Sequence, residues 1–487
     1  MSTLLMLAAP GAPIAAAIGY AWAGWRTSTR WLGAAASVWL LAVAVALAVR
    51  ITRHGSIRAI DGLCRVDALS VWMLLVIGAV SLVATLANPA HLDAEIAAGA
   101  SARSTRRYLV LIQAFVATMT AAVLAANLGT LWVAVEATTI VTAFLVGHRH
   151  HRAAVEAAWK YVVICSVGIA LALLGVVLLN YAAARTAAHG LDLDALTSDG
   201  AVLDPGVTRI AVALLLLGFG AKAGLAPLHA WLPDAHSQAP APVSALMSGV
   251  LLSVSFYALL RVKLISDAAL GPDFARRLLL TGALAGLVLA AMLLIAQRDY
   301  KRMLAYSSME HMGLLGLGAA IGGPAAMAGV LLHVLGHGLG KSVLFVGSGQ
   351  ILQTTGTSHI EGVRGLATSR PLLAGAFGVG ILALIGMPPF PLFVSQLSIV
   401  RAGFAAGLGW AVVAAVLLML IAAGALLVHS SGMLLGAPSQ TADTEEREPV
   451  RSAVPLVTGL VACAALGITI WPVAALLQAA AAVGAGR

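Results

Sequence analysis

The chain has 487 residues, of which 60% are hydrophobic and only 10% are charged. Soluble proteins carry about a quarter charged residues, so this composition excludes a soluble catalytic domain and indicates an integral membrane protein. The net charge of +9 comes from small basic clusters at the ends of apolar runs. Such clusters hold helix ends at the lipid headgroups, so we expect the lipid bilayer and no nucleic acid as a partner.

The three cysteines, Cys64, Cys165 and Cys463, lie far apart and form no Cys-x-x-Cys pair. This spacing predicts no iron–sulfur, haem or zinc site, and we expect no cofactor in this chain. The N-terminus starts apolar without a basic region before it, which favours a first helix over a cleaved signal peptide.

Apolar stretches bounded by charges or by Gly and Pro predict an all-α integral membrane protein with about 14 spans, because each span takes about 20 residues. The stretches are 4–22, 31–49, 66–87, 108–126, 129–147, 159–183, 207–227, 239–263, 276–296, 303–322, 325–352, 371–401, 405–436 and 453–484. We divide the chain into an N-terminal three-helix segment (1–107), a first repeat (108–263), a second repeat (276–436), and an acidic loop with a C-terminal helix (437–487).

The even number of spans places both termini on one side of the membrane. Alternate loops, starting with the one at Arg26, hold about 14 Lys and Arg against about 11 in the other set. The basic loop at Arg298 belongs to the first set, and an acidic loop from Asp192 to Asp204 belongs to the second. We therefore predict a multi-pass protein of the bacterial inner membrane with its termini outside.

Two predicted spans are interrupted by Gly and Pro. The sequence GFGAKAGLAPLH places Lys222 among glycines with Pro227 after it, and IGMPPFP contains Pro388, Pro389 and Pro391. Proline removes a backbone donor and clashes with the preceding turn, so both helices, the seventh and the twelfth, should break inside the bilayer. Because five spans separate the breaks, we predict two inverted five-helix repeats; the alternative is that Gly and Pro are simply common in membrane helices.

Charged side chains inside the spans carry the functional hypothesis, because each costs about 2.5 to 3.5 kcal/mol at the bilayer centre. Glu136 lies mid-span in TLWVAVEATTIVTAF and must find a cation, water or a proton. Lys222, at the helix break, can change its charge as a carboxylate approaches or withdraws. We interpret them as a proton-carrying pair. The alternatives are a structural salt bridge for Glu136 and snorkelling to the interface for Lys222.

His333, His337 and Lys341 are spaced by four residues in LLHVLGHGLGKSVLF and fall within an arc of about 80° on a helix. Imidazole both donates and accepts, so this stripe suits a water-assisted proton relay that ends at a lysine. A metal would need further ligands from elsewhere, so we predict no metal site. Buried structural packing is the alternative.

Three other ionisable residues are candidates. Glu310 and His311 are adjacent in SSMEHMGLLGLG and should point in different directions. Lys160, near the start of the sixth span, should reach either Glu136 or the headgroups. The basic loop GHRHHR, residues 147–152, is interpreted as a solvated face rather than a metal site.

The string KAGLAPLHAWLPDAHSQAPAPVSALMSGVLL, followed by YKRMLAYSSMEHMG and HVLGHGLGKSVLF, resembles the antiporter-like membrane subunits of respiratory complex I, Mrp-type sodium/proton antiporters and membrane-bound hydrogenases. The resemblance spans about residues 100–435 in the same order. The segments VEATT, WKYVVICSVGIAL and SSMEHMG are most similar to the hydrogenase-4 component F type. That family has 14 core helices with inverted five-helix repeats, and by its pattern Glu136, Lys222, His333, His337 and Lys341 are expected to move protons.

Two positions depart from the family pattern. Ser253 stands in GVLLSVSFYALLRV where a membrane lysine often lies, and Gln396 stands in PLFVSQLSIV where the twelfth helix often carries Lys or Glu. Neither side chain titrates. Either another residue, such as His429 or Glu310, supplies the last proton-loading site, or the subunit no longer completes a channel.

The resemblance implies a proton-translocating subunit of a redox-driven complex, with other membrane subunits and a hydrogenase-like or quinone-reductase-like peripheral arm as partners. The redox chemistry would then occur on those partners. One alternative is a non-pumping scaffold, which Ser253 and Gln396 favour. Another is a subunit of a cation/proton antiporter or of an inorganic-carbon transporter. The stripe of His and Lys favours protons over sodium, for which more oxygen ligands are expected.

Overall fold

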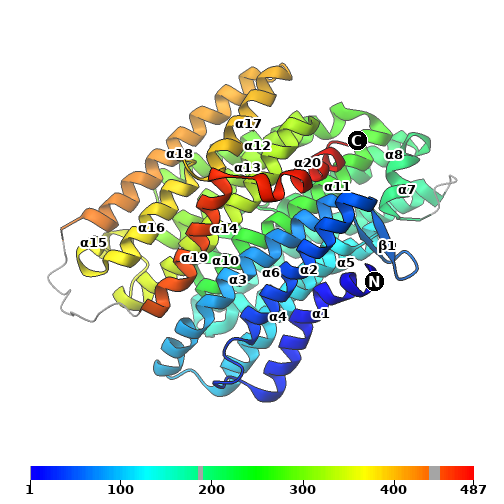
Figure 1. Ribbon diagram of the computed structural model, residues 1–487. Helices are drawn as coiled ribbons and strands as arrows, with labels where there is room; N and C mark the ends of the chain where they lie inside the picture. The colour runs from blue at the N-terminus through cyan, green and yellow to red at the C-terminus, as the bar shows by residue number, and fades with distance from the viewer. Residues whose placement is uncertain (1, 185–189, 438–449, 487) are drawn as a thin grey trace.

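The structure is a computed structural model that describes residues 2–184, 190–437 and 450–486. In these ranges the chain forms one bundle of long helices packed side by side, with one small hairpin of strands β1 (Ile57–Ala59) and β2 (Cys64–Val66) at one end (Figure 1). The predicted all-α membrane fold is confirmed, and the hairpin is an addition to it.

The first half of the bundle follows the predicted order. It consists of α1 (Ser2–Ala23), α2 (Leu32–His54), α3 (Ala68–Ala97), α4 (Ala102–Leu124), α5 (Leu128–Val146), α6 (Arg152–Ala184), the short α7 (Leu193–Ser198), α8 (Pro205–Lys222), α9 (Trp231–Gln238), α10 (Ala241–Leu246) and α11 (Leu252–Leu270). A π-helical turn, η3 (Met247–Leu251), joins α10 to α11 without a break in the helix.

The second half begins at α12 and ends near the C-terminus. It consists of α12 (Pro272–Ile295), α13 (Tyr300–Ile321), α14 (Gly323–Thr355), the short α15 (Leu366–Ser369), α16 (Pro371–Leu384), α17 (Pro391–Ala405), α18 (Gly409–Leu435), α19 (Val450–Ile468) and α20 (Ala474–Gly484). Twelve helical stretches of the described chain are long and apolar enough to cross a membrane. The two other predicted spans correspond to α13, which carries several ionisable residues, and to the pair α16 and α17, which are each short.

Both predicted helix breaks are present. Helix α8 ends at Lys222, and Gly224 then takes a left-handed conformation at φ +77° before α9 starts. Helix α16 ends at Leu384, and Gly386 adopts φ +82° before α17 starts at Pro391. A left-handed φ is cheap only for glycine, and proline is well placed at the first turn of a new helix, so the sequence itself determines these breaks. A third break was not predicted: the expected single helix over 453–484 is two helices, α19 and α20.

Aspartate or asparagine side chains start several of the helices. The carboxylate or amide oxygen of Asp67, Asn127, Asp204 and Asp299 accepts a backbone N–H in the first turn of α3, α5, α8 and α13, respectively. These caps satisfy donors that have no partner within the helix. They fix where the helices that carry the ionisable residues begin.

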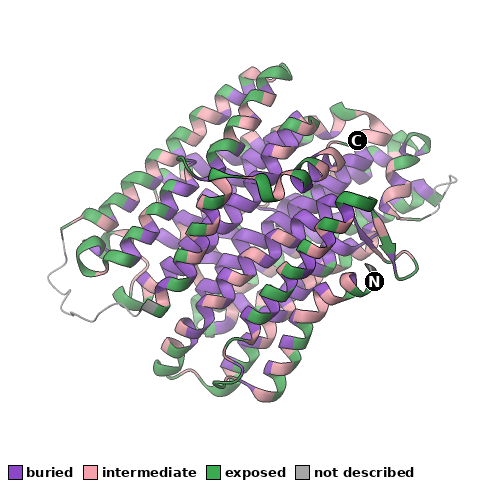
Figure 2. Cartoon of the chain, viewed as in Figure 1, coloured by how far each residue is buried: buried purple, intermediate pink, exposed green. Residues whose placement is uncertain are grey.

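The centre of the bundle is formed by α14 and by the continuous stretch from α10 to α11. The membrane-crossing part of each is entirely buried by other helices, as the purple core in Figure 2 shows. Polar residues on α14 therefore face protein and not lipid. The two termini lie toward the same end of the bundle, as the even number of spans predicts (Figure 1).

Candidate functional site

Glu136 lies in the middle of α5 and is half-buried. It lines a pocket of about 450 Å³ on the outer face of α5 and α6, together with Arg107, Phe144 and Trp159. Glu136 Oε2 accepts a hydrogen bond from Thr139 Oγ1, one turn along the same helix, at 2.9 Å. The carboxylate is thus accessible from the side of the bundle, and it also contacts the interior through its hydrogen bond with Thr139.

Lys222 is fully buried as the last residue of α8. Its Nζ donates to the carbonyl oxygen of Val135 at 2.6 Å and to Thr139 Oγ1. A helix C-terminus stabilises a cation, and these acceptors replace water. The expected pairing with Glu136 is therefore indirect: no ion pair within 4.0 Å joins the two groups in the described chain, and the hydroxyl of Thr139 lies between them.

The His333, His337 and Lys341 side chains form one fully buried stripe on α14, as predicted. His311 of α13 inserts against it. Its Nδ1 lies 3.0 Å from His333 Nε2, and its ring centroid lies 4.9 Å from that of His337. At the other ring nitrogen, His333 Nδ1 lies 2.9 Å from Ser395 Oγ of α17. Three imidazoles from two helices thus form one cluster that extends to a broken helix.

Lys341 continues this cluster toward the other end of α13. Its Nζ donates to the carbonyl oxygen of Leu304 at 2.6 Å and to Ser307 Oγ. Glu310 and His311 were expected to point apart, but Glu310 Oε2 lies 3.6 Å from His311 Nε2. That expectation is wrong because α13 is buried all along this stretch, so two long polar side chains turn toward the same polar interior.

Lys160 does not contact Glu136. Its half-exposed ammonium lies 2.8 Å from Glu156 and 3.1 Å from Asp234 of α9, which also accepts from Arg302. Helix α9 follows the first break, and its position beside α6 brings Asp234 to the lysine. This contact could not be predicted without knowing where the broken helix goes.

The basic loop is only partly solvated. His150 and His151 are exposed, but His148 is buried, which corrects the interpretation for that residue. The Nε2 atoms of His148 and of His91 lie 3.5 Å and 3.4 Å from the two oxygens of Glu95 on α3. The half-buried carboxylate of Glu95 thus attracts His148 into the bundle.

His236 is a candidate that sequence reasoning did not single out. It is fully buried on α9, and its ring stacks on Phe345 of α14 at a centroid distance of 4.8 Å. Neither ring nitrogen has a hydrogen-bond partner among the described residues. The histidine lies in the segment HAWLPDAHSQAP, but its spacing from other ionisable residues carries no periodic signal because α9 is a short separate helix.

The two residues that depart from the family pattern, Ser253 and Gln396, both make contacts inside the bundle. Ser253 Oγ donates to the carbonyl of Gly249 on its own helix at 3.2 Å. Gln396 packs against Gly386 in the second helix break, where its side-chain amide fills the space that a Cβ would occupy. His429, considered as a substitute, lies 3.1 Å from the carbonyl oxygen of Leu294 at the end of α12.

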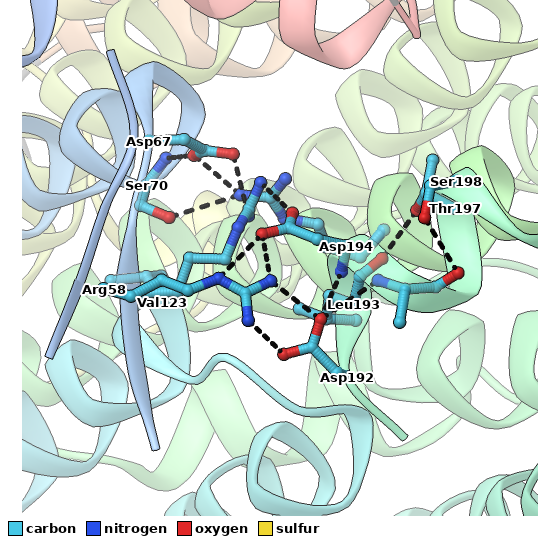
Figure 3. Close-up of polar contacts among 12 residues, drawn as sticks. Arg58, Asp67, Ser70, Val123, Asp192, Leu193, Asp194, Thr197 and Ser198 are labelled. Carbon is cyan, nitrogen blue, oxygen red and sulfur yellow. Dashed lines mark hydrogen bonds and ion pairs between the residues drawn. The ribbon is translucent and has the colours of Figure 1, made fainter. Parts of the chain in front are cut away.

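An ion-pair cluster joins the hairpin to the bundle at the end that holds the termini (Figure 3). Arg58 of β1 donates to both oxygens of Asp192, at 2.9 Å and 2.8 Å. Arg65 of β2 and Arg261 of α11 lie on either side of Asp67, at 2.9 Å and 2.7 Å. The contacts of Arg58 with Asp192 and of Arg261 with Asp67 connect segments that are more than 100 residues apart in the chain.

The charges of this cluster shift its carboxylates toward the ionised form. Burial raises the pKa of Asp192, but the backbone N–H of Ala195 and the guanidinium of Arg58 together outweigh burial, so the pKa lies below its usual range. Burial also raises the pKa of Asp67, but the guanidinium groups of Arg261 and Arg65 lower it by more, so the pKa of Asp67 lies well below its usual range. Both carboxylates are ionised at neutral pH.

Two broken helices around a buried series of lysine and histidine side chains define an antiporter-like membrane subunit. The family described as "NADH:quinone oxidoreductase/Mrp antiporter, TM" matches residues 125–422. The hydrogenase-4 component F homolog of Methylacidiphilum infernorum is 36% identical over 412 residues, which cover 84% of this chain and 85% of that protein. The chain therefore belongs to the NADH:quinone oxidoreductase/Mrp antiporter family of membrane proteins.

Other relatives agree with this assignment. NADH-quinone oxidoreductase subunit N of Desulforudis audaxviator is 37% identical over 303 residues, which are 61% of this chain and 59% of that protein. Hydrogenase-4 component B of Escherichia coli is 31% identical over 345 residues, and the match spans 49% of its length.

Solved structures share the fold. A chain of the Mrp complex from Dietzia sp. DQ12-45-1b superposes with a TM-score of 0.86 at 22% identity, covering 99% of this chain and 97% of that one. A chain of respiratory complex I from Thermus thermophilus gives a TM-score of 0.80 at 22% identity, covering 99% of both. The resemblance stated from the sequence is confirmed.

Proposed function

We propose that this protein translocates protons as the antiporter-like membrane subunit of a redox-driven complex of the hydrogenase or complex I type. The observation that carries the proposal is the series of titratable groups that runs from the half-buried Glu136 to the fully buried Lys222, histidine cluster and Lys341. A buried charge costs several kcal/mol in a bilayer, so such a series is expected to have a task.

The arrangement supports charge coupling in two halves. In the first half, Lys222 and Glu136 share one hydroxyl, so a change of charge on either group alters the electrostatic potential at the other. In the second half, Lys341 lies one turn from His337 on α14, and His311 is at hydrogen-bond distance from His333. His311 touches His337 only by ring contact, because neither ring nitrogen of His337 has a hydrogen-bond partner among the described residues. Histidines at hydrogen-bond distance can exchange a proton by alternating donor and acceptor roles.

The partners in this proposal are other membrane subunits and a peripheral redox arm. Support comes from the relatives, whose names include hydrogenase-4 components and a quinone oxidoreductase subunit. A neighbour in fold is a chain of the membrane-bound sulfane sulfur reductase, at a TM-score of 0.87 and 23% identity. The electron transfer would take place on those partners.

We place the protein in the bacterial inner membrane with both termini outside. The end of the bundle with Arg298 and Arg302 would face the cytoplasm, and the end that holds the acidic loop with Asp192 would face outward. The division into segments 1–107, 108–263, 276–436 and 437–487 remains part of this proposal. It is supported by the two similar breaks, although residues 438–449 lie outside the described ranges.

The proposal is tested with the assembled complex in liposomes, where redox turnover and proton gradient are recorded together. Glu136→Gln and Lys222→Ala should each lower the number of protons moved per electron pair while the peripheral enzyme still turns over. A full gradient at normal turnover in both variants would contradict proton translocation through this chain.

A non-pumping scaffold is the second candidate, and the position of Gln396 favours it. This amide stands next to Ser395, the residue of α17 that reaches His333, and it cannot take up a proton. A scaffold predicts that Lys341→Ala weakens assembly and leaves proton stoichiometry unchanged. A cation/proton antiporter or an inorganic-carbon transporter would instead co-purify in mild detergent without redox subunits.

A further inference from the structure

Among the described hydroxyl groups, only that of Thr139 contacts both a lysine ammonium and a carboxylate. Its oxygen accepts from Lys222 Nζ, and its proton is donated to Glu136 Oε2 at 2.9 Å. The side chain is almost fully buried between α5 and α8. A hydroxyl that accepts from a cation and donates to a carboxylate forms a directed hydrogen-bonded chain.

The polarity of this chain is set by the surrounding acceptors. Lys222 also donates to the carbonyl of Val135, which orients the ammonium along the first turn below Thr139. That carbonyl also accepts from Thr138 at 2.7 Å, so the Thr138 hydroxyl is directed to its own helix and not to Glu136. Thr139 is therefore the residue that connects the two ionisable groups.

The second buried lysine provides an internal comparison. Lys341 Nζ donates in the same way to two acceptors on α13, the hydroxyl of Ser307 and the carbonyl oxygen of Leu304. The hydroxyl of Ser307, however, donates back to Leu304 at 2.9 Å and not to a carboxylate. Among the described residues a lysine held by a carbonyl and a hydroxyl is thus found twice, and of these two hydroxyls only that of Thr139 donates to a carboxylate.

From this contrast we propose that Thr139 relays a proton between Lys222 and Glu136. The relay rests on the proposed proton-translocating function and assigns a residue to its first step. As the proton on Lys222 Nζ moves to Thr139 Oγ1, the hydroxyl proton of Thr139 moves to Glu136 Oε2. The products are a neutral amine and a neutral carboxylic acid, and the number of protons is unchanged. The reverse transfer restores the ion pair.

The relay explains how the two groups exchange charge without direct contact. Separating two charges in a medium of low dielectric costs energy, and a transfer through one hydroxyl removes both charges in a single step. Glu136 also lines the pocket on the flank, so its proton can then leave in a direction different from the one by which it arrived.

The test compares four variants of the assembled complex in liposomes at matched redox turnover. Thr139→Val keeps the shape and removes the hydroxyl, and Thr139→Ser keeps the hydroxyl. Thr120→Val is the matched control, because Thr120 is a buried threonine of α4 that donates only to its own helix, to Val116 at 2.8 Å. Glu136→Gln reports on the proposed function itself.

We expect Thr139→Val to lower the rate of proton translocation at least about tenfold, since a positioned proton donor commonly contributes more than that. Thr139→Ser and Thr120→Val should keep the rate of the unmodified complex. If Thr139→Val does not assemble, Thr139→Cys replaces it with the same expectation, because a thiol is a poor hydrogen-bond relay of similar size.

Three results would overturn the inference, and they are distinguishable. Normal translocation in Thr139→Val with a loss in Glu136→Gln would refute the relay and leave the proposed function intact. Normal translocation in both variants would refute the proposed function as well. Equal losses in Thr139→Ser and Thr139→Val would show a packing role and also refute the relay.

Discussion

Both ring nitrogens of His333 have a polar neighbour, Ser395 Oγ at Nδ1 and His311 at Nε2. The Ser395 hydroxyl donates to the carbonyl of Leu392 at 2.8 Å, so its oxygen is free to accept from Nδ1, and a rotation of the hydroxyl toward His333 would reverse the donor direction. A single serine on α17 therefore acts on the proton position at a histidine of α14.

Removing that hydroxyl should disturb the cluster. Ser395→Ala is expected to slow proton translocation several-fold and to lower stability by about 1 kcal/mol, the usual loss for one buried hydrogen bond. The measurement is liposome acidification together with thermal unfolding in detergent. Ser398→Ala is the control, because Ser398 lies one turn on and donates only to Val394 of its own helix. Equal behaviour of the two variants would argue against a role for Ser395.

The stripe of His333, His337 and Lys341 could be predicted from sequence because it depends only on helical periodicity within one segment. His311 and Thr139 could not be placed, because their contacts depend on the rotation of α13 and α5 about their axes, and one sequence gives no measure of that rotation. Lys160 illustrates the same limit, since its partner Asp234 belongs to a short helix whose direction follows from tertiary packing.

Helix packing in the first repeat depends on close backbone approach between α6 and α8. A Cβ at Gly218 would lie 2.4 Å from the carbonyl oxygen of Gly168 and 2.7 Å from the backbone nitrogen of Ala172. Small residues let membrane helices approach in this way. The contact fixes α8, and with it the position of Lys222 four residues later.

Gly218→Ala should therefore lower stability by about 1 to 3 kcal/mol, the usual cost of overpacking. Gly375→Ala is the control, since Gly375 is an exposed helical glycine with open space around its Cα. Thermal unfolding of the two variants in the same detergent makes the comparison. If Gly218→Ala lowered the unfolding temperature no more than Gly375→Ala does, the interface between α6 and α8 would be shown to accommodate the added methyl group.

The hairpin is held by carboxylates whose pKa values lie below the usual range. Such groups stabilise the folded contact at pH values above their unfolded pKa, about 4, and the stabilisation is lost as pH falls through the lowered folded value. We expect the protection of strands β1 and β2 against hydrogen exchange, taken relative to the intrinsic rate at each pH, to stay constant from neutral pH to about 4 and to fall below it. Asp192→Asn should remove most of this pH dependence. Exchange that is equally pH-dependent in this variant would contradict the assignment.

The breaks of the seventh and twelfth helices were predictable because Gly and Pro impose them locally. The break between α19 and α20 was not, because Pro472 alone after an apolar run resembles many intact membrane helices. Twelve described helices are long and apolar enough to cross a membrane by themselves, and the other two predicted spans are present in different form: α13 carries several ionisable residues, and the twelfth span is divided into two short helices.

The two ends of the bundle carry different loops, the basic loop at Arg298 and the acidic loop at Asp192, and the orientation of the bundle can be measured. In a background with Cys64→Ser, a cysteine at Ala201, which is exposed at the end that holds Asp192, should react with an impermeant maleimide added to intact cells. A cysteine at Thr354, which is exposed at the other end, should react only after the membrane is permeabilised. The opposite labelling pattern would reverse the proposed orientation.

The pocket beside Glu136 has a consequence for assembly. Because the carboxylate opens sideways, whatever stands against α5 and α6 determines whether it is bathed in solvent, coated by acyl chains or sealed by protein. A chain isolated in detergent therefore differs electrically from the same chain between neighbours, although its own atoms are unchanged. The neighbouring subunit or lipid beside α5 and α6 therefore controls the environment of the Glu136 carboxylate, and the functional unit includes that neighbour.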